Sequence, residues 1–274
     1  MKKRFLGCIF LFCALTTLPA LAAEKQSQQA LTFAVVPQQS AKKLAKLWTP
    51  LLKEISATSG VELVFTTAPN IPIFEQRLER GEYDFAYMNP YHFTVFNQTA
   101  GYHALAKQRN KSIQGIIVVK QDSPITTLQQ LENLTLAFPA PAAFAATLLP
   151  KADLQAQNIL IESRYVSSHD SVYLAVARGL LPAGGGIMRT FNNAPEQVRD
   201  SLRVLWKTKA HTPHAIASHM SVPLEVRERV LQSLLSLDKT KQGKGLLKTI
   251  NFSAFESAED NDWDDIRALG IKTL

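Results

Sequence analysis

Residues 31 to 56 read LTFAVVPQQSAKKLAKLWTPLLKEIS, and this stretch indicates the fold class. Its first six residues form a run of β-branched and aromatic side chains that Pro37 ends, which predicts a strand. After Ala41, apolar side chains recur at helical spacing, at Leu44, Leu47, Trp48, Leu51, Leu52 and Ile55. A strand followed directly by an amphipathic helix is the first half of a βαβ unit.

The alternation of strands and helices continues along the chain. Gly60 closes the first helix, and we expect further strands at 61–66, 83–88, 104–106, 113–120, 134–138, 164–166 and 202–206. Helices are expected at 73–80, 140–149, 170–178 and 226–237. No repeat or low-complexity linker divides the chain. We therefore expect an α/β protein of two lobes joined by crossing strands, with a ligand cleft at the carboxyl ends of the sheets.

The amino-terminal segment, residues 1–23, has the order of a secretory signal peptide. Basic residues at 2–4 precede an apolar run over 5–18, and small residues at its end provide a cleavage site. The run is shorter than the roughly 20 apolar residues that a membrane anchor needs. Because both cysteines, Cys8 and Cys13, lie in this segment, we expect a mature periplasmic protein without a disulfide or a thiolate metal site.

The charge balance is mildly basic. Lysine and arginine number 30 against 23 aspartate and glutamate, a formal net charge of +7. Three of the basic residues lie in the leader, which leaves 27 basic and 23 acidic residues, a net charge of +4, in the mature chain. The basic residues are scattered and form no arginine-rich or aromatic-interleaved motif, so we expect no nucleic-acid partner.

The segment from Tyr83 to His92 is the first candidate for ligand binding. A strand ends there, Asn89 is placed as the N-cap of a helix, and Pro90 suits the first helical position. Free backbone amides and the positive end of the helix dipole favour an anion at such a turn. We expect donors from the side chains of Tyr87, Asn89, Tyr91 and His92.

A second candidate joins a predicted strand to the helix that begins near Asp170. Ser167, Ser168 and His169 place hydroxyls, an imidazole and open amides together, as an oxyanion requires. The alternative is that the polar residues here only cap the helix.

A third candidate is the segment 184–190, which begins with three glycines. Glycine lets backbone approach a ligand closely, although a glycine run can also be a simple turn. The guanidinium of Arg189 can grip an oxyanion with two hydrogen bonds, and we expect Thr190 beside it to bind as well.

The sequence does not indicate an enzyme. Ser168, His169 and Asp170 are adjacent, whereas the members of a catalytic triad are brought together in space. There is no G-x-S-x-G elbow, P-loop or dinucleotide glycine motif, so we expect no catalysis and no cofactor. A metal-binding receptor remains an alternative, because imidazole is a common metal ligand. The spacing of the histidines is not that of a helical metal pair. The candidates are His92, His169, His211, His214 and His219.

Four segments together resemble the phosphonate, phosphite and phosphate substrate-binding proteins of ABC importers, within the type II periplasmic-binding superfamily. In chain order they are residues 33–37, 81–87, 119–125 and 167–172. The resemblance spans nearly the whole mature chain. It implies a hinged two-lobed type II fold, with mixed sheets flanked by helices and hinge strands between the lobes, that captures a small oxyanion.

The resemblance also implies site residues. His169 matches a ligand-binding histidine of the family, and residues 87–91 match a binding loop of the first lobe. The family's Ser-Thr-Ser-Gly phosphonate loop is replaced here by 139–144 (Pro-Ala-Pro-Ala-Ala-Phe), which has no hydroxyl. Only the backbone of this loop can then bind the ligand, and we expect it to do so at Ala142 and Ala143.

Other departures from the family pattern bear on the ligand. A tyrosine often seen in the first lobe falls near Ile71, and an acidic residue expected after the second-lobe helix falls within 183–186. An acidic residue at this position would suit an amine on the substrate, so its absence argues against an aminoalkylphosphonate as the ligand. Arg189, which the common pattern lacks, would replace the missing hydroxyls of the loop.

The expected organisation is a monomer in which residues 24–112 and 212–274 form lobe 1 and residues 113–211 form lobe 2. The expected partner is the permease of an ABC importer. A role that feeds a membrane sensor kinase or cyclase is the alternative that the sequence leaves open.

Overall fold

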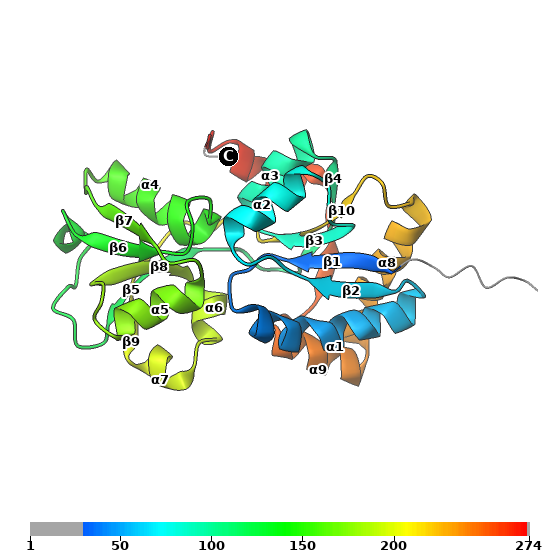
Figure 1. The fold of residues 1–274 in the computed structure, drawn as a ribbon, viewed down its shortest axis with the longest axis horizontal. Coiled ribbons are helices and arrows are strands. Elements are labelled where there is room, and N and C mark those ends of the chain that lie inside the picture. The colour runs from blue at the N-terminus through cyan, green and yellow to red at the C-terminus, as the bar shows by residue number, and fades with distance from the viewer. Residues whose placement is uncertain (1–29, 273–274) are drawn as a thin grey trace, which may run out of the picture.

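The computed structural model describes residues 30–272, which form two lobes, each built on its own β-sheet with helices on both faces (Figure 1). The predicted signal peptide lies outside the described residues. Within them, no helix combines the length and the apolar character needed to cross a membrane.

The first lobe contains the two ends of the described chain. Its sheet has the order β11-β4-β10-β3-β1-β2, in which β1 is parallel to β2 and β3, while β10 and β11 run antiparallel to their neighbours. The elements of this lobe are β1 (Leu31–Val35), α1 (Ala41–Ser59), β2 (Leu63–Thr66), α2 (Ile71–Glu79), β3 (Phe85–Met88), α3 (Pro90–Thr99), β4 (Tyr102–Gln108), β10 (Ala215–His219), α8 (Leu224–Ser236), η3 (Leu237–Lys239), α9 (Lys241–Thr249), β11 (Phe255–Ser257), η4 (Asp260–Trp263) and α10 (Asp264–Arg267).

The second lobe is formed by the middle of the chain. Its sheet has the order β7-β6-β8-β5-β9, with β6 parallel to β7 and β8 and with β5 antiparallel to β8 and β9. The elements are β5 (Gly115–Lys120), η1 (Gln129–Leu131), β6 (Thr135–Phe138), the π-helical turn η2 (Phe144–Leu148), α4 (Leu149–Ala156), β7 (Glu162–Tyr165), α5 (His169–Ala177), β8 (Ala183–Ile187), α6 (Met188–Asn192), α7 (Glu196–Asp200) and β9 (Leu202–Lys207).

Local sequence explains the helices that surround the cleft. The Ser40 side chain caps α1 by accepting from the amide of Lys43, and Gly60 ends the helix in the left-handed region at φ 66°. Asn70 caps α2 and Asn89 caps α3 in the same way, each by accepting from the amide three residues ahead. The predicted amphipathic helix therefore buries Leu44, Trp48, Leu51, Leu52 and Ile55 against the first sheet.

The chain crosses between the lobes twice, from β4 to β5 and from β9 to β10. The two crossings pair with each other, because the backbones of Ile113 and His211 exchange hydrogen bonds of 2.8 and 2.9 Å. Two paired extended segments form a hinge about which the lobes can rotate.

The three consecutive glycines form the middle of β8 instead of a ligand loop, which corrects the expectation for 184–186. A Cβ on Gly185 would meet the carbonyl oxygen of Ala146 at 1.9 Å, and one on Gly186 would meet the Tyr173 hydroxyl at 2.3 Å. Packing against η2 on one face and α5 on the other therefore requires residues without side chains.

Candidate functional site

A small cavity of about 10 Å³ lies between the lobes at the carboxyl ends of the strands. We call it the interlobe cavity. Its walls are Val36, Gln38, Ile71, Asn89, Ile113, Ala143, Phe144, Ala145, Ala146, His169, Ile187 and His214. A cavity of this size holds about one water molecule, so a larger ligand requires the lobes to move apart.

Four helices from the two lobes begin at this cavity. The first residues of α2 and α5 and the N-cap of α3 line it, as do the first three residues of η2 after Ala143. The first amides of a helix have no carbonyl behind them to bond, and the helix dipole is positive at that end. The cavity is therefore electropositive before any charged side chain is considered.

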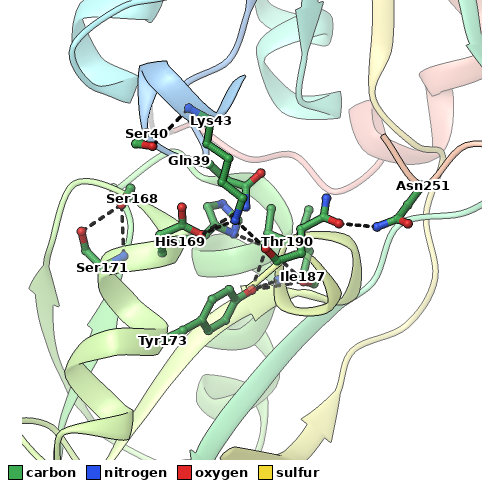
Figure 2. Close-up of polar contacts among 12 residues, drawn as sticks. Gln39, Ser40, Lys43, Ser168, His169, Ser171, Tyr173, Ile187, Thr190 and Asn251 are labelled. Atoms are coloured by element: carbon green, nitrogen blue, oxygen red, sulfur yellow. Dashed lines mark hydrogen bonds and ion pairs between the residues drawn. The ribbon is translucent and has the colours of Figure 1, made fainter. Parts of the chain in front are cut away.

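His169 reaches the cavity from the first position of α5 and is held from behind. Its Nδ1 lies 3.0 Å from the Thr190 hydroxyl, which lies 2.7 Å from the Tyr173 hydroxyl (Figure 2). Its Nε2 has no hydrogen-bond partner among the described residues and is available to a ligand. Burial, followed by the nearby positive charge of Arg189, lowers the pKa of His169 to about 3, so the imidazole is neutral.

A hydrogen-bond relay connects Arg189 to the second imidazole, His214. The Arg189 guanidinium donates to the Oε1 of Gln38, so the amide nitrogen of Gln38 is the donor toward the Nε2 of His214 at 2.9 Å. The Nε2 of His214 must therefore be unprotonated. In agreement, burial and then Arg189 lower the pKa of His214 well below 6.5.

These two histidines predict a pH dependence of folding. Both are neutral when buried, whereas in the unfolded chain they become protonated below about pH 6.5. The stability they contribute is present above pH 6.5 and is lost as the pH falls toward 3, by about 1.4 kcal/mol per pH unit and per histidine. We expect the free energy of unfolding of the ligand-free protein, measured by urea denaturation, to fall by about 3 kcal/mol between pH 6.5 and 5 through this pair.

A His169→Asn variant isolates half of this effect. It should lose about 2 kcal/mol of the change over the same interval, because the asparagine does not titrate. An unaltered dependence on pH in the variant would show that the buried imidazole is not the group responsible.

A second, larger cavity of about 110 Å³ adjoins the first on the side of the hinge. We call it the hinge-side chamber. Its walls are Tyr87, Gln108, Ser112, Ile113, Gln114, Ile187, Met188, Arg189, Pro213 and His214. Because Ile113, Ile187 and His214 line both spaces, the chamber is a direct neighbour of the interlobe cavity.

Tyr87 forms an aromatic floor beneath the chamber. Its ring stacks on His214 with the centroids 4.9 Å apart, and the Arg189 guanidinium lies over the same ring at 5.6 Å from the centroid. Contact with an aromatic face favours a guanidinium and fixes its plane. Burial raises the pKa of the Tyr87 hydroxyl, so it is a neutral donor.

Polar contacts at the mouth of the cleft hold the lobes together. Lys43 of the first lobe lies 3.6 Å from the Asp170 carboxylate and donates to the carbonyl of Asn193. The Gln39 amide donates to the same Asp170 at 3.1 Å, and Asn251 donates to the Asn193 side chain (Figure 2). We call Gln39, Lys43, Asp170, Asn193 and Asn251 the latch.

The latch predicts a change in the lifetime of the closed state. In Lys43→Ala we expect the bound ligand to dissociate about two to five times faster, because a half-exposed ion pair of this kind contributes up to about 1 kcal/mol. Stopped-flow displacement measures this rate. Lys42→Ala, which removes the same charge from an exposed position of α1, is the matched control and should keep the original rate. Equal rates in both variants would contradict a role for the latch.

The structure gathers about half of the residues predicted to bind the ligand. The predicted residues that line one of the two cavities are Tyr87, Asn89, Ala143, His169 and Arg189. Asn89 also bridges the lobes, since its amide donates to the carbonyl of Ala142 at 3.2 Å. Ala142 therefore lies at the lobe contact without lining either cavity.

Tyr91 and His92 were also expected to bind the ligand, but neither lines the interlobe cavity or the hinge-side chamber. Tyr91 lies beside α10, with its hydroxyl 3.5 Å from the carbonyl of Ile271. His92 is fully buried, and its Nε2 lies 2.8 Å from the Glu75 carboxylate. On a helix that begins at the cleft, these positions point back into the lobe.

Ser167, Ser168 and Thr190, which were also expected to bind the ligand, line neither cavity. Ser168 caps α5, since its hydroxyl oxygen accepts from the Ser171 amide at 3.1 Å. Ser167 is exposed in the left-handed region at φ 71°. Thr190 is fully buried behind His169, where it orients the imidazole (Figure 2).

Gln38 is a site residue that the sequence reasoning missed. It follows β1 at the carboxyl end of the sheet, and that position was a usable signal. Its carbonyl accepts from the His169 amide at 2.9 Å, and its side chain joins Arg189 to His214. The contact with the second lobe, which gives Gln38 its role, is not visible in the sequence.

Of the histidines considered for a metal, only His169 and His214 line the same cavity. His211 lies against Asp265 at 3.2 Å, and His219 lies 2.7 Å from the Ser221 hydroxyl. Within residues 30–272, no three histidine, cysteine, aspartate or glutamate side chains come together in a way that could hold a metal ion.

The fold and the site define a class. Two α/β lobes joined by two paired crossings, with a cavity between them lined by helix N-termini, describe a two-lobed solute-binding protein of the type II periplasmic architecture. The model of the family described as "ABC transporter, phosphonate, periplasmic substrate-binding protein" matches residues 33–263. The chain belongs to this family, which is one of substrate-binding proteins and not of enzymes.

Individual proteins agree with this assignment. The chain is 22% identical over 279 residues to the phosphonates-binding periplasmic protein of Escherichia coli (strain K12), covering 94% of this chain and 81% of that protein. A binding-protein component of an ABC phosphonate transporter of Pseudomonas aeruginosa superposes with a TM-score of 0.80 at 19% identity, over 89% of this chain and 86% of that one. A protein of Prochlorococcus marinus, solved in complex with methylphosphonate, also superposes with a TM-score of 0.80. It is 18% identical, and the superposition covers 88% of this chain and 97% of that one.

Proposed function

We propose that this chain, exported by a cleaved signal peptide, captures a small phosphonate, phosphite or phosphate ion in the periplasm and delivers it to the permease of an ABC importer. The observation that carries the proposal is the interlobe cavity. Four helix starts, two neutral imidazoles and one guanidinium surround it or border it. No aspartate or glutamate is found among the described residues that line it.

Each part of the ion has a complement in the proposed site. The oxygens accept from the first-turn amides of η2, which compensate for the hydroxyls absent from residues 139–144. The amide of Gln38 is a further donor, and so is Nε2 of His169 in the tautomer in which the Thr190 hydroxyl donates to Nδ1; Arg189 contributes the positive charge. The residues proposed to bind the ligand are Gln38, Asn89, Ala143, His169, Arg189 and His214.

Binding proceeds by opening and closing of the lobes in this proposal. We place residues 24–112 and 212–274 in one lobe and residues 113–211 in the other, so that the paired crossings at Ile113 and His211 act as the hinge. The ion enters when the lobes separate and replaces the direct contact between Gln38 and Arg189. The closed form, secured by the latch, is the form offered to the permease.

A ligand screen tests the proposal on protein recovered from the periplasm of an expressing bacterium. Phosphate, phosphite, methylphosphonate, sulfate and arsenate are compared by thermal shift and then by calorimetry. A ligand present at about a thousand times its dissociation constant stabilises by roughly 4 kcal/mol, which raises the melting temperature by about 8 to 16 °C. The proposal is abandoned if methylphosphonate, phosphite and phosphate all leave the melting temperature unchanged.

A further inference from the structure

The hinge-side chamber is the space that the capture of a small ion does not use. Its volume of about 110 Å³ exceeds the roughly 10 Å³ of the interlobe cavity, and three wall residues are common to both. A ligand whose phosphonate group lies in the interlobe cavity can extend a substituent into this chamber, because the two spaces share three wall residues. The chemistry of the chamber wall therefore selects the substituent.

The wall carries one formal charge, the guanidinium of Arg189. Among the described residues that line the chamber there is no aspartate, glutamate or lysine. An ammonium group placed here would meet a like charge and no counter-charge, which disfavours an amino substituent. The same charge favours an anionic substituent.

The geometry of the donors points to a carboxylate. The ring of Tyr87 lies beneath the Arg189 guanidinium and fixes its plane, and a planar guanidinium matches a carboxylate with two parallel hydrogen bonds. The Tyr87 hydroxyl has no hydrogen-bond partner within residues 30–272 and is a further donor on the same wall. The exposed Ser112 side chain adds a hydroxyl at the entrance.

We propose that the hinge-side chamber is a subsite for a carboxylate, so that the preferred ligands are phosphonates whose substituent ends in a carboxyl group. This inference rests on the proposed function and narrows its substrate class. The phosphonate group occupies the interlobe cavity and the carboxylate lies over Tyr87. Arg189 borders both spaces, through its contact with Gln38 on one side and on the chamber wall on the other, so its guanidinium donates to the carboxylate as well as to the phosphonate. Gln38, which Arg189 contacts in the closed form, is then freed to bind the phosphonate oxygens.

Calorimetry with three ligands of one series tests the inference: phosphonoacetate, methylphosphonate and 2-aminoethylphosphonate. We expect phosphonoacetate to bind at least ten times more tightly than methylphosphonate, and 2-aminoethylphosphonate to bind more weakly than either. Equal affinities for phosphonoacetate and methylphosphonate, or a preference for the amine, would overturn the subsite and leave the proposed function intact. Absence of binding by all three and by phosphate and phosphite would overturn the proposed function itself.

Substitutions at two wall positions, Arg189 and Ser112, test the wall directly, and the ratio of affinities for two ligands is the readout. Arg189→Met should reduce the preference for phosphonoacetate over methylphosphonate to about one, whereas Arg189→Lys should retain part of it. Ser112→Asp changes an exposed side chain of the hinge segment, so folding is not at risk. It should lower the ratio of phosphonoacetate to 2-aminoethylphosphonate affinity by more than tenfold. The carboxylate subsite is contradicted if both ratios stay at the wild-type value: phosphonoacetate to methylphosphonate in Arg189→Met, and phosphonoacetate to 2-aminoethylphosphonate in Ser112→Asp.

Discussion

Replacing Arg189 with alanine is expected to weaken the binding of methylphosphonate by about tenfold to a hundredfold. Hydrogen bonds from a charged donor contribute about 1.5 to 3 kcal/mol, and the guanidinium is the only formal charge on the walls of the two cavities in the described part of the chain. The ring of Tyr87 and the contact with Gln38 hold it in place. Calorimetry at constant ionic strength measures the loss.

His169→Ala should also weaken binding, by more than about 1 kcal/mol, because it removes a neutral donor that Thr190 orients. A matched control is Arg178→Ala, which removes a guanidinium from the opposite end of α5 and should leave the affinity unchanged. If both Arg189→Ala and His169→Ala bind methylphosphonate as the unmodified protein does, these residues do not belong to the site.

Replacing Gly185 with alanine is expected to cost about 3 kcal/mol or more of folding stability, the upper end of the range for overpacked cores. The added Cβ would lie 1.9 Å from the carbonyl oxygen of Ala146 and 2.7 Å from the ring of Phe138. A backbone carbonyl cannot rotate away, so η2 must shift from the sheet. Since η2 supplies the amides at the interlobe cavity, ligand affinity should fall together with stability.

Thermal unfolding measures this effect, and a loss of 3 kcal/mol lowers the melting temperature of a chain of this size by about 6 to 12 °C. Gly245→Ala is the control, because no atom lies within 4 Å of the added Cβ in the exposed part of α9. That substitution should stabilise the helix by roughly 0.5 to 1 kcal/mol. A Gly185→Ala protein as stable as the original would mean that η2 does not pack on β8 as described.

Much of the fold follows from local patterns in the sequence. The apolar spacing from Leu44 to Ile55 is enough to predict α1, because one face of a helix must be buried, and Gly60 ends it where a left-handed residue is required. The strands and their alternation with helices follow in the same way. The role of Asn89 as an N-cap was also readable, since it precedes a proline at the first helical position.

Only part of the candidate site can be predicted from local sequence patterns. The sequence brought His169 and Arg189 forward as donors, but it could not distinguish Ser168, which caps a helix, from a ligand-binding serine. A hydroxyl before a helix serves either purpose, and the choice depends on which way the cleft faces. The same limit applies to His92, because only the packed lobe shows that its Nε2 lies against Glu75.

The sequence by itself determined the fold class and the family of the protein, and it predicted oxyanion donors at the strand-to-helix turns. Tertiary structure alone decided the meaning of the glycine run, the relay from Arg189 through Gln38 to His214, and the existence of two adjoining cavities. The physical reason is the distance along the chain over which each interaction acts. Helix periodicity and capping act over a few residues, whereas the Gln38 and Arg189 side chains, 151 positions apart, meet only when the two lobes close.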